Sequence, residues 1–269
     1  MGFIQEKIIH LRIGVSRAYE LLQFSDVHVA TFQASDSEEA KEKAVRQEAL
    51  WRKQRVDFAR KFGETYDSER LLSSTECLER LIDHANDRRP DAVLLTGDLI
   101  DYPSEANQAF LERSLRRIAS PYLFSCGNHD SDSPLFPEPR KRDFDSLDFG
   151  DFFLVSLDDS KRTFSRFQGE ALEKLLTFRK PILLSMHVPL VTECNEAKFA
   201  SLDSYYTVKY TDCDETTGRF LRLVQTSDEV KALFCGHTHG AIVSSIAPNK
   251  PQFCCSSGLI GSVNRILIE

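Results

Sequence analysis

Five short apolar runs in this chain each end in a polar or glycine-bearing cluster, and this pattern constrains the fold more than any other feature. Each run has the length of a β-strand, and several are rich in Val, Leu, Phe or Tyr, as buried strands are. Helical patterns lie between some of the runs, at residues 69–86, 168–178 and 227–233. Strands that alternate with helices predict a layered α/β fold, and open α/β folds place their sites at the carboxyl ends of strands. The five runs and their clusters are YELLQF before Ser25-Asp26-Val27-His28, DAVLLT before Gly97-Asp98, PYLFS before Cys126-Gly127-Asn128-His129-Asp130, PILLS before Met186-His187, and KALF before Cys235-Gly236-His237-Thr238-His239.

The segment of residues 30–68 interrupts this alternation. Ser35-Asp36-Ser37-Glu38 predicts a capping box, and a long helix should follow it to about Phe62. Residues 36–64 hold seven acidic and eight basic residues, which is typical of a solvated helix. An apolar edge on this helix is expected to pack on the same domain, with a partner or substrate as the alternative, and the role of the segment stays open. Its members are Trp51, Arg55, Phe58 and Phe62.

Length and composition indicate one soluble globular domain over residues 1–269, with 41% hydrophobic and 28% charged residues. No apolar stretch approaches the roughly 20 residues of a membrane span. The sequence MGFIQEKIIHLRIG lacks the basic start and long apolar stretch of a signal peptide, so we expect a cytoplasmic protein that does not bind membranes. The formal net charge of −7 disfavours extended nucleic acid as a partner but allows a small phosphorylated substrate.

The side chains of the five clusters suit a catalytic metal better than a structural thiolate zinc. The seven cysteines include no CxxC pair, which argues against a thiolate zinc site or a thioredoxin-like motif. Carboxylate, carboxamide and imidazole ligands without thiolate favour Mn, Fe or Zn in a catalytic centre. Taken alone, His237 and His239 leave open whether they are ordinary surface residues or metal ligands.

Read together and in order, the clusters are Asp26-x-His28, Gly97-Asp98-x-x-Asp101, Gly127-Asn128-His129-Asp130, His187 and Gly236-His237-x-His239. This series resembles the five-motif signature of the calcineurin-like metallophosphoesterases and spans residues 26–239. The resemblance implies a four-layer α/β fold with a central β-sandwich flanked by helices, into which the charged helix is inserted after the first motif. It also implies two divalent metal ions and seven ligands: Asp26, His28 and His239 for one ion, Asn128, His187 and His237 for the other, and Asp98 as the bridge.

By the same resemblance, hydroxide shared by the two ions attacks a phosphate ester in line, and His129 assists the leaving group. Asp101 is expected to orient the His129 imidazole and raise its pKa. Asp130 either shares that work or caps the following turn, and the sequence leaves both open.

Departures from subfamily patterns narrow the choice of phosphoesterase. Protein Ser/Thr phosphatases carry Arg-Gly where this chain has Tyr102-Pro103, and a Glu where it has Asp130. Purple acid phosphatases carry a tyrosinate at the position of Asp101, so a coloured Fe(III)–tyrosinate centre is not expected. The remaining resemblance is to the bacterial phosphodiesterase-like branch, which includes class III cyclic-nucleotide phosphodiesterases.

The sequence therefore predicts a dinuclear phosphohydrolase, with a phosphodiesterase as the first interpretation. The alternatives are a phosphomonoesterase or nuclease of the same superfamily, or a non-catalytic binding scaffold. The substrate is expected to be small, with nucleotides among the candidates, and its binding residues are unassigned. Tyr205, Tyr206 and Tyr210 either stack on a nucleobase or pack their loop. The oligomeric state stays open.

Overall fold

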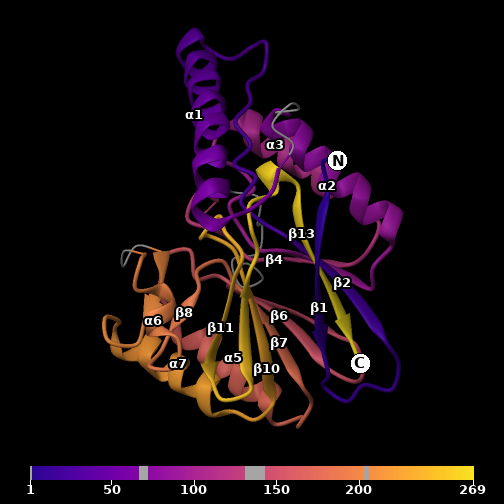
Figure 1. Cartoon of the computed structure of the whole chain (residues 1–269), viewed down its shortest axis with the longest axis vertical. Coiled ribbons are helices and arrows are strands. Elements are labelled where there is room, and N and C mark those ends of the chain that lie inside the picture. Colours follow the sequence, from indigo (N-terminus) through magenta and orange to yellow (C-terminus); the bar gives the residue numbers. More distant parts are fainter. Residues whose placement is uncertain (1, 67–71, 131–142, 203–205) are drawn as a thin grey trace.

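Two mixed sheets that face each other form the centre of the computed structural model, which describes residues 2–66, 72–130, 143–202 and 206–269 (Figure 1). The first sheet has the order β1(Gln5–Leu11), β13(Ser262–Ile268), β2(Tyr19–Phe24), β3(Ala92–Leu95), β4(Tyr122–Phe124). The second has the order β11(Ile242–Ala247), β12(Lys250–Cys254), β10(Val230–Cys235), β7(Ile182–Ser185), β6(Phe153–Leu157), β5(Phe144–Asp148). A separate two-stranded sheet pairs β8(Leu190–Val191) with β9(Val208–Lys209).

Neighbouring residues of the central strands alternate between the inside of this sandwich and its outer faces. Leu21 of β2 and Leu94 of β3 share one core cluster with Leu183 of β7 and Phe234 of β10. Leu22 of β2 belongs to a second cluster on the outer face of its sheet. The strands are therefore buried on both faces, which explains why they read as continuous apolar runs.

Helices cover both outer faces. The first sheet packs against α2(Ser74–Arg88) and α3(Glu105–Leu115), and the second against α5(Arg166–Leu176) and α7(Glu215–Thr226). Short helices α6(Glu196–Phe199) and η2(Gly258–Ile260) lie in connections. The order of helices, sheet, sheet and helices confirms the predicted four-layer α/β fold.

Two of the three short helical patterns are confirmed, as α2 and α5. The helix predicted at residues 227–233 is wrong, because α7 ends at Thr226 and Val230–Cys235 forms strand β10. A window of seven residues is too short to separate the helical period from the strand period. The segment forms a strand because β10 pairs with both β7 and β12.

The inserted helix is α1(Glu38–Phe62), which rises from one end of the molecule in Figure 1. Its N-cap is Ser37, whose side chain accepts a hydrogen bond from the Ala40 amide. The capping box expected at residues 35–38 is therefore wrong: the cap lies two residues later, and Ala40 at the third helical position cannot return a side-chain hydrogen bond. The predicted end at Phe62 is confirmed, since Gly63 closes the helix in a left-handed conformation with φ 65°.

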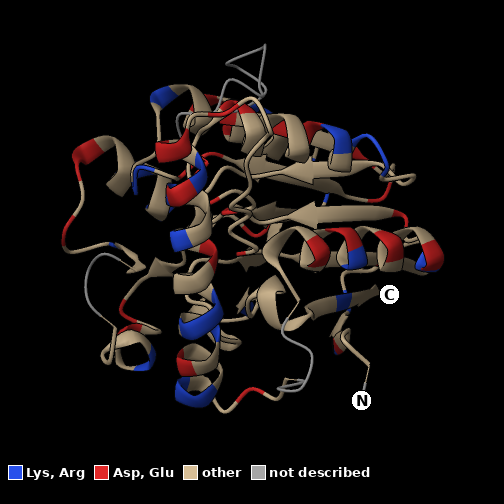
Figure 2. Cartoon of the chain, turned by 90° about the horizontal axis from the view of Figure 1, so that it is seen from above, with Lys and Arg blue, Asp and Glu red and all other residues tan. Residues whose placement is uncertain are grey.

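The surface helices carry both signs of charge, with Lys and Arg interleaved among Asp and Glu (Figure 2). The apolar edge of α1 packs on the rest of the chain, as expected: Trp51 joins the outer core of the first sheet, and Phe58 packs against that core. Within the described ranges, no helix is long and apolar enough to cross a membrane.

Candidate metal centre

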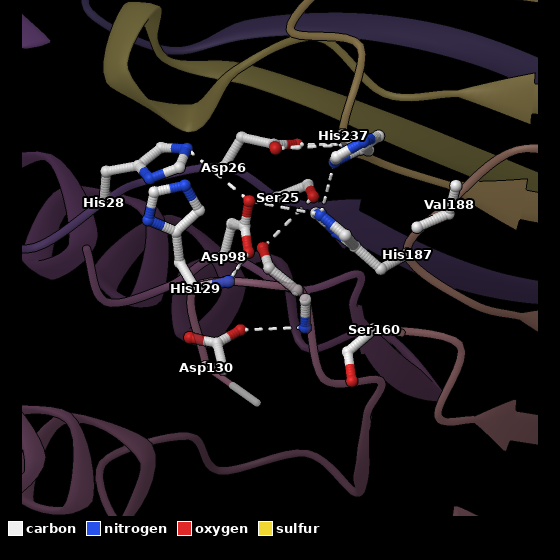
Figure 3. A network of polar contacts seen from close by, with 12 residues as sticks. Ser25, Asp26, His28, Asp98, His129, Asp130, Ser160, His187, Val188 and His237 are labelled. Atoms are coloured by element: carbon white, nitrogen blue, oxygen red, sulfur yellow. Dashed lines mark hydrogen bonds and ion pairs between the residues drawn. The ribbon is translucent and has the colours of Figure 1, made fainter. Parts of the chain in front are cut away.

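The five polar clusters converge at one edge of the sandwich, because β2, β3, β4, β7 and β10 all end there. The loops that follow β2 and β3 are tied together by backbone bonds, such as the His28 amide to the Asp98 carbonyl at 2.9 Å. The Gly236 amide donates to the His187 carbonyl at 2.9 Å in the same way across the second sheet. Both sheets therefore contribute to a single site, as Figure 3 shows.

The backbone at this edge is strained. Five non-glycine residues of the site adopt the left-handed region, which side chains other than glycine seldom occupy. Such conformations cost roughly 1–3 kcal/mol each and cluster at functional sites. Here they lie in the loops that aim carboxylates and imidazoles toward one point. The residues are Asp26 (φ 55°), His28 (48°), Asp98 (52°), His237 (67°) and His239 (55°).

Asp26, His28 and His239 form the first ligand group, in which one ligand atom of each residue lies within 4.8 Å of the others. The Nε2 atoms of His28 and His239 face each other at 3.1 Å, and His239 Nε2 lies 3.4 Å from Asp26 Oδ1. All three residues are buried. Nitrogen and oxygen atoms gathered this closely, away from water, fit a cation between them.

Asp98, His187 and His237 form the second ligand group. His187 Nε2 lies 3.2 Å from Asp98 Oδ2 and 3.0 Å from His237 Nδ1. The opposite nitrogen, His187 Nδ1, donates to the Thr96 carbonyl at 2.7 Å, which leaves Nε2 available for a metal. Asn128 lines the same cavity as Asp98 and His237, and its Oδ1 atom is buried.

Asp98 connects the two groups. Besides its contact with His187, its Oδ2 atom lies 3.8 Å from His28 Nε2. Burial raises the pKa of Asp98, but the charge of His187 outweighs it and holds the pKa well below the ordinary value, so the carboxylate is ionised. An ionised oxygen between two imidazole groups has the position and charge of a bridging ligand.

The imidazoles differ in protonation. Burial lowers the pKa of His187, but Asp98 outweighs it and raises the pKa to about 10. Burial dominates at the first group, where the pKa of His28 is lowered and that of His239 lies well below its ordinary value. Neutral imidazoles are the form that binds metals, so His28 and His239 are ready for a cation, whereas His187 must first lose a proton.

His129 and Asp101 lie beside the first group as a pair. His129 Nδ1 is 2.6 Å from the Asp101 carbonyl oxygen and 3.3 Å from Asp101 Oδ1. Burial lowers the pKa of His129, but the Asp101 and Asp98 carboxylates outweigh it and raise the pKa to about 9. His129 could also complete a ligand group with His28 and Asp98. Its side chain is 31% exposed, which leaves it open to a substrate.

The sequence did not identify Trp51 as a contributor to this pair. Its Nε1 donates to Asp101 Oδ1 at 2.7 Å, and its ring stacks on His28 with centroids 3.6 Å apart. Phe58, two turns further along α1, lies 4.6 Å from the His239 ring. The only sequence signal was the apolar spacing of these residues, which predicts a buried edge but not what the edge contacts.

Asp130 and Asp159 act on the backbone. Asp130 accepts hydrogen bonds from the Ile100 and Gly127 amides at 3.1 and 3.0 Å, so it fixes the turn that precedes it and the loop after Asp98. The turn after Asp130, which the sequence offered as one alternative, lies outside the described residues. Asp159, which the sequence did not single out, accepts from the His187 and Val188 amides, both at 2.9 Å, and thereby fixes the loop that carries His187.

Of the tyrosines expected near the site, Tyr205 lies outside the described residues. Tyr206 lines the cavity with its ring 5.3 Å from that of His237, and both Tyr206 and Tyr210 pack against the outer core of the second sheet. The Tyr102 ring lies 3.8 Å below Lys43 Nζ and belongs to neither ligand group.

The comparisons with known proteins agree with this geometry. A family model described as calcineurin-like phosphoesterase matches residues 19–241, a range that contains all nine predicted site residues. The chain belongs to the calcineurin-like phosphoesterases. It is therefore a metallophosphoesterase, and its buried His and Asp groups fit a dinuclear metal centre.

Solved structures share the fold of this phosphoesterase. A dimetal phosphatase from Danio rerio superposes with a TM-score of 0.58 at 12% identity, over 91% of each chain. A purple acid phosphatase from yellow lupin (Lupinus luteus) seeds gives a TM-score of 0.50 at 14% identity, over 92% of this chain and 45% of that one. No curated protein sequence matches the chain.

Proposed function

We propose that this phosphoesterase is a phosphodiesterase of the bacterial phosphodiesterase-like branch, acting on a small substrate such as a nucleotide. In this proposal Asp26, His28 and His239 hold one divalent ion, Asn128, His187 and His237 hold the other, and Asp98 bridges them, with Mn, Fe or Zn as the metal. The main observation behind the ligand assignment is the position of Asp98 Oδ2, which lies 3.2 Å from His187 Nε2 and 3.8 Å from His28 Nε2. One carboxylate that faces two ligand groups is what a bridged pair of ions requires.

Two ions bound in these groups would supply Lewis acidity and a water nucleophile at neutral pH. His129 would deliver a proton to the leaving oxygen. Since its Nδ1 is engaged by Asp101, Nε2 is the atom left for that transfer. The raised pKa of about 9 keeps the imidazole protonated, and nearby cations would bring the pKa closer to neutrality, where a general acid works best.

Asp101 would orient His129 and stabilise its charged form. Burial raises the pKa of Asp101, but the contact with His129, the nearby His28 imidazole and the hydrogen bond from Trp51 outweigh it and hold the pKa far below the ordinary value. The carboxylate therefore stays ionised and can face the imidazolium throughout the reaction.

The preference for a diester over a monoester follows from charge. Among the described residues that line the cavity, none is Lys or Arg. A monoester carries about two negative charges near neutral pH, and a diester carries one. In the described part of the cavity, a lining without Lys or Arg is better matched to the single charge of a diester.

The test is turnover with defined metals. The protein is stripped of metal, reloaded separately with Mn²⁺, Fe²⁺ and Zn²⁺, and analysed for ions per chain. Hydrolysis of bis(4-nitrophenyl) phosphate is then compared with that of 4-nitrophenyl phosphate, and Asp98→Asn serves as the control that disrupts the bridge. We expect two ions per chain and a higher kcat/KM for the diester.

Each alternative has its own outcome in this experiment. Faster hydrolysis of the monoester would favour a phosphomonoesterase, and the structural neighbour from Danio rerio is a dimetal phosphatase. Two bound ions without turnover of either ester would indicate a binding scaffold. Activity on long nucleic acid that weakens steeply with salt would indicate a nuclease.

A further inference from the structure

The inserted helix α1 forms one side of the cavity that contains the candidate metal centre. This cavity has a volume of about 290 Å³ and is lined on its other side by Asp98, Asn128, His129 and the C-terminal histidines. We use "α1 wall" for Gln47, Leu50 and Gln54, which line the cavity from positions three and four residues apart along one helix face.

The α1 wall is uncharged although the helix is not. Of the 25 residues of α1, 13 are Asp, Glu, Lys or Arg, yet none of these lines the cavity. Leu50 is 42% exposed beside the metal-centre side chains. In the described part of the chain the side-chain amides of Gln47 and Gln54 form no hydrogen bond with another residue. The wall therefore offers a ligand an apolar surface between two amides that can each donate and accept.

Contacts along α1 hold the wall in place. Arg55, which is 2% exposed, donates to the Leu259 carbonyl at 3.1 Å and to the Leu72 carbonyl at 2.9 Å. Glu48 accepts from both the amide and the hydroxyl of Ser74 at the start of α2, at 3.1 and 2.6 Å. A ligand would therefore meet a preformed surface, which lowers the entropic cost of binding.

We infer that the α1 wall binds the organic group esterified to the phosphate, and that this group is uncharged, with hydrogen-bonding atoms on its edge and an apolar face. A nucleoside has this chemistry, whereas a choline-type cation does not. This inference rests on the proposed function, because it assigns the phosphate to the metal side of the cavity. The volume is at the lower end of ligand pockets, so the group is small.

Three diesters with a common 4-nitrophenolate leaving group test the inference: the 4-nitrophenyl esters of thymidine 5′-monophosphate, of phosphocholine and of phenyl phosphate. Because the leaving group is constant, differences in kcat/KM report on the second substituent. We expect the thymidine ester to be the best substrate of the metal-loaded protein and the choline ester the poorest.

Gln47→Leu and Gln54→Leu remove the amides and keep much of the side-chain volume. Each should lower kcat/KM for the thymidine ester about two- to tenfold, the effect of one neutral hydrogen bond, and change that of the phenyl ester little. Val45→Ala is the matched control, since Val45 lies on α1, is 59% exposed and does not line the cavity. It should leave all three values unchanged.

The outcomes separate this inference from the proposed function. Turnover of all three diesters without preference, or glutamine variants that affect every ester alike, would overturn the inference and leave the phosphodiesterase proposal standing. No turnover of any diester by protein that holds two ions would overturn both. A thymidine preference that both glutamine variants remove supports the assignment of the α1 wall.

Discussion

Gly236 precedes the first histidine of the last motif, and its replacement by alanine is a steric test of the metal centre. A Cβ added at Gly236 would lie 2.0 Å from Ser25 Oγ, 2.7 Å from Asp26 Oδ2 and 2.7 Å from the Thr96 carbonyl oxygen. The backbone of Gly236 is not in the left-handed region, so alanine meets no conformational penalty there. The effect of Gly236→Ala should therefore come from these contacts alone.

The displacement can be worked out from those distances. Ordinary contact begins at 3.4 Å, so Asp26 Oδ2 must retreat by about 0.7 Å and Ser25 Oγ by about 1.4 Å. Metal sites tolerate ligand shifts of only about 0.2 Å. We expect the variant to lose the ion of the first ligand group and about 100-fold or more of its turnover. Overpacking should also destabilise the fold by about 1–3 kcal/mol.

Gly169→Ala is the matched control. Gly169 lies in α5, and a Cβ added there meets no atom within 4 Å. This variant should keep both ions and full turnover, and gain about 0.5–1 kcal/mol because alanine stabilises a helix interior relative to glycine. Ions per chain, hydrolysis of bis(4-nitrophenyl) phosphate and thermal unfolding are measured for both variants. Two ions and normal turnover in Gly236→Ala would refute the steric reasoning.

Four further predictions concern other parts of the site. His129→Ala should retain both ions while kcat for alkyl phosphate esters, whose leaving group needs a proton, falls about 10²- to 10⁴-fold. Loss of metal would instead make His129 a ligand. Trp51→Phe keeps an aromatic ring against the first ligand group but removes the hydrogen bond to Asp101. The kcat for alkyl esters should fall about tenfold. The fall should be smaller for 4-nitrophenyl esters, whose leaving group needs no proton. Arg55→Met removes the guanidinium donor from two carbonyls and leaves them only the weak Cys77 thiol, so it should cost about 1–3 kcal/mol in urea unfolding. An unchanged midpoint would contradict this. The pKa of His187 in the metal-free protein is about 10, so Mn²⁺ binding at pH 7 should release a proton and the affinity for Mn²⁺ should rise with pH up to about 10. Calorimetry in buffers of different ionisation enthalpy measures the proton release. An affinity that does not change with pH would refute the prediction.

Local patterns were sufficient for the strands that carry the site. Each apolar run is short, mostly buried and followed by a polar or glycine-bearing cluster, so β2, β3, β4, β7 and β10 could be predicted from the sequence. Helix α1 was readable for the same reason, because its charge pattern and terminal glycine are local signals. The errors at residues 35–38 and 227–233 are local too, since two serines compete to cap one helix and seven residues fit either period.

The tertiary structure decided which side chains support the site. Trp51 reaches Asp101 across 50 residues of sequence, and Arg55 reaches Leu259 across 204. The sequence left the role of Asp130 open and did not single out Asp159. Both accept hydrogen bonds from backbone amides that only the folded loops bring near.

The sequence by itself determined the strand ends, because these depend on neighbours in the chain. The set of seven metal ligands came from the resemblance of the five motifs to a family, and it stays a prediction. Only the tertiary structure placed α1 beside the cavity and gave it an uncharged face there. Hydrophobic spacing says that a helix edge is buried, but the contact that buries it depends on the packing of the whole chain.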